Sequence, residues 1–315
     1  FSCGPLMLGY LAQSPAGRQA VAAIKAFSAQ AAAEKGAQPP ETYLFSPLGR
    51  IHVLLEDNWV DQAIAEMEEI LPGEPASREA ESLMVTALTR RGEDLIESSR
   101  YDDALSVLER ALGYKHDTKA VQALVSRACT RWAHQLSQEK QVEQAIAVLE
   151  RGLRLAPQDA DIKTNLCACC CERGRLLNNE DKFDAAIEVL ERALEVDPQN
   201  AQARNYLQVT LLNKAGQLAK GRSYGRYDQA LVVAQRAIAL GDLAPEHRKF
   251  VAHLYNERGV ARWNSGDSMR ARSDFEQAFK FDPTDSAIQQ NLINSGGVAS
   301  LDPAVLMEIL RQKRR

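Results

Sequence analysis

Six alanines recur at a nearly constant interval along this chain of 315 residues. Ala63, Ala104, Ala145, Ala186, Ala230 and Ala271 are separated by 41, 41, 41, 44 and 41 residues. Each lies in a similar phrase, of which YDDALSVLERAL and FDAAIEVLERAL are two copies. A fixed period of this length is typical of a chain that stacks one structural unit many times. Stacked units usually present an extended binding surface rather than a catalytic pocket.

Other positions keep the same register and define two helices in each unit. Apolar or small residues stand four and seven residues after each alanine, which places all three on one helical face. Twelve residues after the alanine a proline ends one helix and precedes the next, at Pro75, Pro157, Pro198 and Pro283. Twelve residues before it a small residue would let two helices approach, at Gly92, Ala133, Gly174 and Gly259. In the fifth copy we expect Gly216 in this role, with a turn two residues longer, and Pro245 as the proline.

This pattern resembles the tetratricopeptide repeat (TPR), and the match covers roughly residues 41–285. The resemblance implies an all-α, right-handed solenoid of about six helix pairs. The usual repeat has about 34 residues, whereas the period here is 41. Since Pro157 and Gly174 are 17 residues apart, the seven extra residues belong to the first helix of each pair. Two added turns lengthen that helix while keeping its buried face.

Residues outside the repeats predict helical caps. We expect residues 1–40 to form an alanine-rich cap or linker, residues 41–285 the six repeats, and residues 286–315 the C-terminal capping helices and a basic tail. The segment SAIQQNLIN copies the start of a first helix, and VLMEIL would cover the last face. The RQKRR tail is interpreted as solvated. The segment LAKGRSYGRY predicts a mobile loop between the two helices of the fifth repeat.

Composition excludes several classes of function. A formal net charge of -4 argues against a general nucleic-acid binder. No run of 18 apolar residues is present, so no membrane contact is expected. Cys167, Cys169, Cys170 and Cys171 are too crowded for a disulfide framework, which favours reduced thiols and a cytoplasmic location.

No motif carries a complete chemistry. The string GQLAKGRS resembles a phosphate-binding loop, but Arg222 replaces the lysine and no strand is expected before it. Cys167, Cys170 and Cys171 could share a helical face and sense a metal or an oxidant, yet nothing completes a four-ligand site. Packing is the favoured interpretation of these cysteines. We therefore predict no enzyme activity, no catalytic residue, no metal and no cofactor.

The resemblance places the binding surface on the concave face, which the first helices line. Its predicted partner-binding residues are Arg127, Arg131, His134, Arg175, Asn178, Asn213, Lys214, Lys220, Asn256 and Trp263. Arginine and lysine can hold carboxylates, and asparagine can pair with the backbone of an extended peptide. A simply solvated face would look the same in sequence. The Lys–Asn–Asn–Lys–Arg clamp of some TPR co-chaperones is not reproduced, because the matching positions include Thr130, His134, Cys171 and Arg175.

The leading hypothesis is a scaffold or adaptor that binds an extended or acidic peptide segment of another protein in the concave groove. An alternative is a regulatory or sensing arm of a larger multidomain enzyme, which the start at Phe1 rather than methionine motivates. A thiol or metal sensor built on Cys167, Cys170 and Cys171 is the third. Partner binding separates the first hypothesis from the others, and metal content tests the third.

Overall fold

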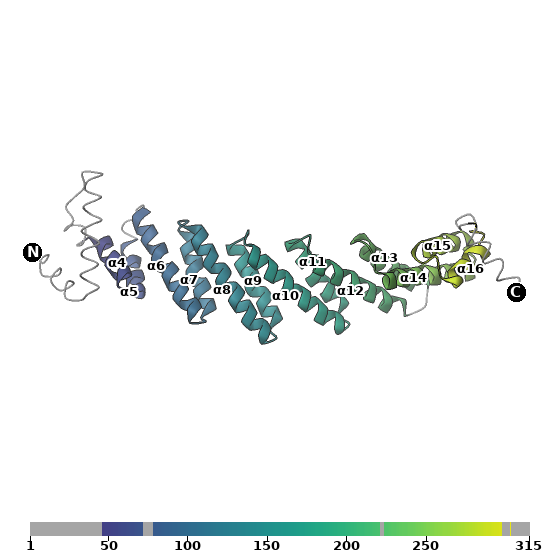
Figure 1. The fold of residues 1–315 in the computed structure, drawn as a ribbon, viewed down its shortest axis with the longest axis horizontal. Helices are drawn as coiled ribbons and strands as arrows, with labels where there is room; N and C mark the ends of the chain where they lie inside the picture. Colours follow the sequence, from purple (N-terminus) through teal and green to yellow (C-terminus); the bar gives the residue numbers. More distant parts are fainter. Residues whose placement is uncertain (1–45, 72–77, 221–223, 298–302, 304–315) are drawn as a thin grey trace, which may run out of the picture. The chain divides into compact units, whose positions relative to one another are not determined.

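The structure is a computed structural model that describes residues 46–71, 78–220, 224–297 and 303. These residues form thirteen helices and no strand (Figure 1). None of the described helices is long and apolar enough to cross a membrane. The chain divides into two compact units, Phe1–Asn165 and Leu166–Arg315, with the boundary inside helix α10 (Ala160–Asn179). The all-α fold of helix pairs predicted from the sequence is confirmed.

In the first unit each pair joins a first helix to a second, and consecutive helices pack together. The helices are α4 (Pro47–Glu56) with α5 (Val60–Ile70), α6 (Arg78–Glu97) with α7 (Tyr101–Gly113), and α8 (Thr118–Gln138) with α9 (Val142–Leu155). In the second unit the remaining helices are α11 (Phe183–Val196), α12 (Ala201–Ala219), α13 (Tyr224–Ala239), α14 (Pro245–Asn264), α15 (Ser268–Phe281) and α16 (Ser286–Asn294).

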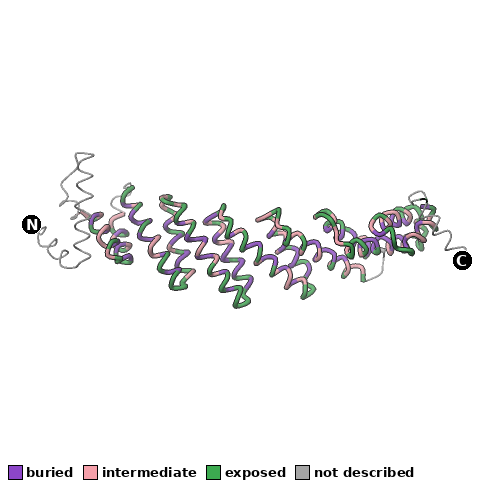
Figure 2. Tube along the Cα trace, in the orientation of Figure 1, coloured by how far each residue is buried: buried purple, intermediate pink, exposed green. Residues whose placement is uncertain are grey.

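From α6 onward the first helices are longer than the second helices, as the 41-residue period predicts. Helices α6, α8, α10, α12 and α14 have 20, 21, 20, 19 and 20 residues. Helices α7, α9, α11, α13 and α15 have 13, 14, 14, 16 and 14 residues. The six repeated alanines are all 0% exposed, and buried residues recur along one face of each helix (Figure 2). Burial of this face, rather than helix propensity, holds each pair together.

Glycine on the first helix admits a large side chain from the second helix of the same pair. A Cβ atom at Gly174 would lie 2.5 Å from Cγ of Leu190, and one at Gly259 would lie 2.6 Å from the ring of Phe275. Gly92 meets Leu108 in the same way, at 2.7 Å. These distances leave no room for a side chain, so glycine is required for close approach of the two helices.

The same turn joins the two helices of most pairs. Its central residue has a left-handed backbone at Asn58, Ser99, Lys140, Asp181 and Gly266, with φ of 62°, 59°, 61°, 58° and 86°. The next N–H donates to a carbonyl five residues earlier, as Lys182 does to Leu177 at 3.0 Å. This hydrogen bond belongs to the Schellman motif, which satisfies the last carbonyls of a helix. Helix α16 ends in the same way, with Gly296 at φ 82° and the Gly297 N–H donating to Leu292.

The fifth pair corrects two expectations. The buried small residue of α12 is Ala215, 41 residues after Gly174, whereas Gly216 is only half-buried. The interval from this small residue to the repeated Ala230 is therefore three residues longer than in the other pairs, not two. LAKGRSYGRY is mostly helical, because α12 runs to Ala219 and α13 begins at Tyr224. Only residues 220–223 lie between the two helices, so the prediction of a long loop was wrong.

Of the predicted caps, SAIQQNLIN is confirmed as a helix, α16. The alanine-rich segment in residues 1–40, the VLMEIL segment and the RQKRR tail lie outside the described residues.

Candidate functional site

A pocket of about 440 Å³ lies on the first helices of the second unit. It opens between the end of α10, the start of α11, the last two turns of α12 and the first two turns of α14. Its lining residues are Asn178, Asp181, Phe183, Leu212, Asn213, Gly216, Gln217, Lys220, His247 and Phe250. Three of them, Asn178, Asn213 and Lys220, belong to the predicted partner-binding set.

The floor of the pocket is apolar. Phe183 and Leu212 are 6% and 3% exposed, and Phe250 is half-buried. A Cβ atom at Gly216 would lie 3.4 Å from the ring of Phe250, which is ordinary van der Waals contact. Gly216 is thus an uncrowded glycine, and the space above it belongs to the pocket. An apolar floor of this kind favours a ligand with an apolar part.

Two amides form one side of the rim. The Asn213 Nδ2 donates a hydrogen bond to Asn178 Oδ1 at 3.0 Å, which fixes the orientation of both side chains. Asn178 keeps its own Nδ2 donors, and Asn213 keeps its Oδ1 acceptor, because no hydrogen bond joins these atoms to a described residue. Together they offer a donor and an acceptor side by side, which is what a peptide backbone requires.

Two opposite charges also face the pocket without an ion-pair partner among the described residues. Asp181 and Lys220 are both exposed. His247 contributes a buried Nδ1 atom that has no hydrogen-bond partner within the described chain. A ligand could therefore satisfy a carboxylate and an ammonium group that the described protein leaves free.

The other predicted residues of the second unit are already paired or lie apart from the pocket. Arg175 forms an ion pair with Glu172 at 2.7 Å, and its hydrogen bonds lower the pKa of the Glu172 carboxyl. Lys214 pairs with Asp184 at the start of α11. Asn256 is 8% exposed and accepts a hydrogen bond from Asn291 of α16 at 2.9 Å. Trp263 is 41% exposed at the end of α14.

In the first unit the predicted residues all lie on α8. Arg131 pairs with Glu97 of α6 at 3.1 Å, and Arg127 lies 3.6 Å from Glu93. His134 is exposed. Both arginines therefore join neighbouring first helices, and carboxylates of α6 balance their charges.

Sequence reasoning missed the pocket because it compared equivalent positions of neighbouring repeats. The contacts run instead between residues 34 or 35 apart, as in Arg131–Glu97, Asn213–Asn178 and Asn291–Asn256. With a period of 41, adjacent first helices are displaced by about two turns, or about 10 Å. This displacement places Gly216 and Lys220 of α12 beside Phe250 and His247 of α14. The seven extra residues of each first helix were the signal that could have predicted it.

Three of the four cysteines of α10 are buried in the packing between helices. Cys167, Cys170 and Cys171 are 1%, 0% and 2% exposed, and the thiol of Cys167 lies 3.4 Å from the Ala193 carbonyl oxygen. Burial raises the pKa of Cys171 to about 11 and that of Cys129 to about 12. Within the described ranges no group of three His, Cys, Asp or Glu side chains could hold a metal. Neutral, buried thiols are poor metal ligands and poor nucleophiles.

The string GQLAKGRS does not form a phosphate-binding loop over the described residues. Gly216 to Ala219 lie on α12, and the described part of the chain places no strand before them. Residues 221–223 lie outside the described ranges.

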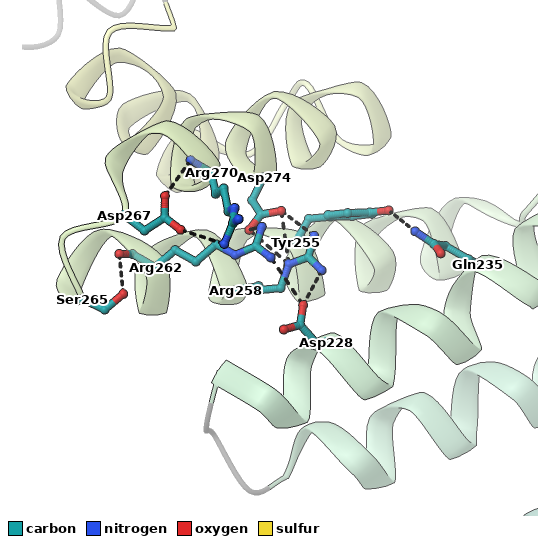
Figure 3. A network of polar contacts seen from close by, with 9 residues as sticks. All are labelled: Asp228, Gln235, Tyr255, Arg258, Arg262, Ser265, Asp267, Arg270 and Asp274. Atoms are coloured by element: carbon teal, nitrogen blue, oxygen red, sulfur yellow. Dashed lines mark hydrogen bonds and ion pairs between the residues drawn. The ribbon is translucent and has the colours of Figure 1, made fainter.

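A second polar cluster, in α13 to α15, is internally balanced (Figure 3). The Asp274 side chain, 3% exposed, accepts hydrogen bonds from Arg258 and Arg262, and Arg258 also donates to Asp228 at 2.7 Å. Burial alone would lower the pKa of Arg258, but the hydrogen bonds and charges of Asp274 and Asp228 outweigh it and raise that pKa. Two guanidinium groups thus meet two carboxylates, which joins the three helices and leaves no net charge for a ligand.

Charged residues of the second helices also pair with one another. Arg110 meets Glu68, Arg151 meets Asp102 and Glu109, and Arg236 meets Glu191 of the preceding second helix in the same unit. This ladder explains the recurring Glu-Arg dipeptide of the phrase LERAL. Exposed pairs of this kind contribute about 0–1 kcal/mol each.

The comparisons with known proteins identify the repeats. Sequence profiles described as tetratricopeptide repeat match residues 89–160, 168–200 and 252–285. No curated protein matches the chain.

Solved structures with a similar fold include a TPR repeats protein from Bacteroides fragilis NCTC 9343. It has 14% identity and a TM-score of 0.33, over 83% of this chain and 100% of that chain. MamA from Desulfovibrio magneticus RS-1 has 16% identity and a TM-score of 0.24, over 61% and 98%. The TPR domain of P58(IPK) has 13% identity and a TM-score of 0.25, over 85% and 98%.

Because these TM-scores are low, the family assignment rests on the repeat sequences and on the helix pairs that they build. Profile matches fall in both units, most of the small and apolar positions of the pattern are buried in the described helices, and Pro157, Pro198 and Pro283 lie between helix pairs. The chain therefore contains tetratricopeptide repeats in both of its units.

Proposed function

We propose that this chain is a protein-interaction scaffold that binds a segment of a partner across the pocket on the first helices of its second unit. TPR proteins serve mainly as protein-interaction modules, which supports the general role. The specific role rests on one observation, the open pocket that gathers Asn178, Asn213 and Lys220. We place this site within a repeat domain spanning residues 41–285, and we expect it to work without catalysis.

The pocket is a better candidate than the rest of the predicted surface because its polar groups are available. Arg127, Arg131 and Lys214 already hold carboxylates of the chain. Binding a partner through them would first break those pairs. At the pocket, by contrast, Lys220 and Asp181 have no ion pair to lose within the described chain.

Site-specific photo-crosslinking tests the proposal. A benzoylphenylalanine at Gln217, on the rim, should crosslink a partner in the native host, whereas one at the exposed Glu188 of α11 should not. Gly216→Leu should abolish the Gln217 crosslink, because its side chain enters the pocket. The same crosslinked protein from both probe positions, with no effect of Gly216→Leu, would rule out the pocket.

A matched control separates blocking from unfolding. Gly225 is also a helical glycine, and a Cβ atom added there would meet no heavy atom within 4 Å. Gly225→Leu should leave crosslinking unchanged. Circular dichroism should show the same helical content for both leucine variants.

A further inference from the structure

We infer that the pocket holds one aromatic or large aliphatic side chain of an extended peptide, with an acidic residue on one side of this anchor and a basic residue on the other. This deepens the function proposed above and rests on it. The inference assigns a separate role to the floor of the pocket, to its amide pair and to its two free charges.

The apolar floor and the volume of the pocket indicate which side chain of the ligand it holds. Phe183, Leu212 and Phe250 line the pocket, and the ring of Phe250 lies next to Gly216. A pocket of about 440 Å³ lies toward the lower end of the roughly 300–1,000 Å³ that accommodate drug-sized ligands. It has room for one large side chain and the adjoining backbone. Aromatic rings gain most from such a site, because they bury a large area and favour edge or face contact with other rings.

The amide pair defines the backbone of the ligand. Asn178 and Asn213 hold each other through one hydrogen bond, so both are oriented before a ligand arrives. Their remaining donor and acceptor match the C=O and N–H of an extended residue. A preoriented pair loses little side-chain entropy on binding. An extended segment is therefore favoured over a helix, whose backbone groups bond internally.

The free charges define the flanks of the anchor. Lys220 ends the α12 side of the pocket, and Asp181 lies in the turn after α10. Because the two groups form no ion pair within the described chain, each can meet an opposite charge of the ligand. Lys220 selects an acidic residue, and Asp181 selects a basic one. Like charges at either flank would be repelled, which gives the pocket a direction as well as an anchor.

The sequence of the fifth repeat makes the pocket possible. Gly216 takes the place that Arg175 has one period earlier, 41 residues before it. Arg175 fills the corresponding position with a long side chain that pairs with Glu172. Removing that side chain opens space over Leu212 and Phe250. The glycine thus leaves space in the fifth repeat where the fourth has the side chain of Arg175.

Selection of random dodecapeptides displayed on phage, against the full chain, tests the inference. Selected peptides should share a Phe, Tyr, Trp or Leu between residues of opposite charge. Synthetic copies, measured by fluorescence anisotropy, should bind Gly216→Leu at least tenfold more weakly than the unchanged chain. The matched Gly225→Leu variant should bind them within twofold.

Charge reversal tests the flanks. Lys220→Glu should weaken binding about three- to tenfold and should restore it for a peptide whose acidic flank is changed to lysine. Lys280→Glu, at an exposed site on α15, serves as the control. Asp181→Lys should have the converse preference. It is expected to fold, because Lys140 occupies the same left-handed turn position in the third pair.

Different outcomes separate this inference from the proposed function. Peptides that lose affinity with Gly216→Leu but share no anchor or flanking charges would overturn the inference and leave the pocket as the binding site. Peptides that bind Gly216→Leu as well as the unchanged chain would overturn both. Binding of N-acetyl-phenylalaninamide alone as tightly as the selected peptides would also overturn the inference, since the backbone and flanks would then contribute nothing.

Discussion

The fourth and fifth helix pairs, α10–α11 and α12–α13, solve the same packing problem in two ways. In the fourth, Gly174 lets the side chain of Leu190 lie against the backbone of α10. In the fifth, the equivalent positions hold Ala215 and Ala234, both 0% exposed. The fourth pair thus combines a glycine with a leucine at these positions, and the fifth pair combines two alanines. The two pairs therefore have the same fold, although the side-chain volume is divided differently between the first and the second helix.

The difference shows how a glycine that is not needed for helix packing can instead leave space for a binding pocket. In α10 the glycine is needed for packing and cannot be changed without moving Leu190. In α12 the packing position is an alanine, so the neighbouring, half-buried Gly216 is not needed for packing against α13 and leaves space for the pocket. The three extra residues of the fifth repeat are accommodated because α13 begins six residues before its repeated alanine, whereas α11 begins three residues before. A substitution should therefore have opposite consequences in the two pairs.

The largest expected effect comes from forcing the fifth pair to resemble the fourth. Ala234→Leu adds three heavy atoms to a closed interface and should destabilise the protein by about 2–3 kcal/mol. Adding Ala215→Gly should recover about 1 kcal/mol or more, because the glycine makes room for the leucine as Gly174 does. Urea denaturation of both single variants and the double variant measures this coupling. Strict additivity would mean that the two positions do not face each other as Gly174 and Leu190 do.

A somewhat smaller effect is expected at the glycine of the fourth pair. Gly174→Ala places a Cβ atom 2.5 Å from Leu190 Cγ. Overpacking of this kind costs about 1–3 kcal/mol, of which the higher helix propensity of alanine returns up to about 1 kcal/mol. We expect a net loss of about 1–2 kcal/mol in the free energy of unfolding. Hydrogen exchange should show the loss in α10 and α11. Unchanged protection there would indicate that Leu190 moves aside without cost.

Much of this fold follows from the sequence because each repeated position has one physical role. The alanine at each second helix, the glycine opposite Leu108, Leu190 or Phe275, and the proline between pairs all predict the packing correctly. The fifth pair was misread because Ala215 and Gly216 are both small, and composition does not tell which one faces the second helix. Only the burial pattern of α12 separates them.

The candidate site was less predictable for a geometric reason. The repeat pattern identified Asn178, Asn213 and Lys220, but nothing in it placed Phe183, His247 or Phe250 beside them. Equivalent positions of two repeats are not neighbours when the first helices are displaced by about two turns. Carboxylate partners were also missed, because Glu97 and Asp184 pair across helices at separations that the repeat period does not mark.

A third effect, of about 1 kcal/mol, is a pH dependence of the free energy of unfolding that we expect from the fourth pair and not from the fifth. Cys171 of α10 corresponds to Leu212 of α12, and both are buried. Burial, and next the neighbouring Cys167, raise the pKa of Cys171 to about 11 in the folded chain, against about 8.5 unfolded. The folded state therefore holds the proton more tightly, so this contribution to stability is complete below about pH 8.5 and is lost as the pH rises toward 11.

The measurement compares the unchanged chain with Cys171→Ala at pH 7.5 and pH 9.2. The loss of stability between these two pH values should be about 1 kcal/mol smaller in the variant, whatever cavity the alanine leaves. Cys129 remains in both proteins and cancels. Equal losses would mean that the Cys171 thiol titrates in the folded chain as it does in the unfolded one.

The smallest effect has the opposite sign and concerns the glycine of the pocket. Gly216→Ala places its methyl group in ordinary contact with the Phe250 ring, at 3.4 Å. Alanine is favoured over glycine within a helix by about 1 kcal/mol, so the variant should be more stable by about 0.5–1 kcal/mol. The same methyl group narrows the pocket and should weaken binding of an anchored peptide. Thermal denaturation and fluorescence anisotropy on one preparation test both effects. A variant that is less stable would place Gly216 in the same class as Gly174, and the contrast between the two helix pairs would fail. A variant that is more stable and binds more weakly would show that glycine at position 216 lowers stability but is needed for binding.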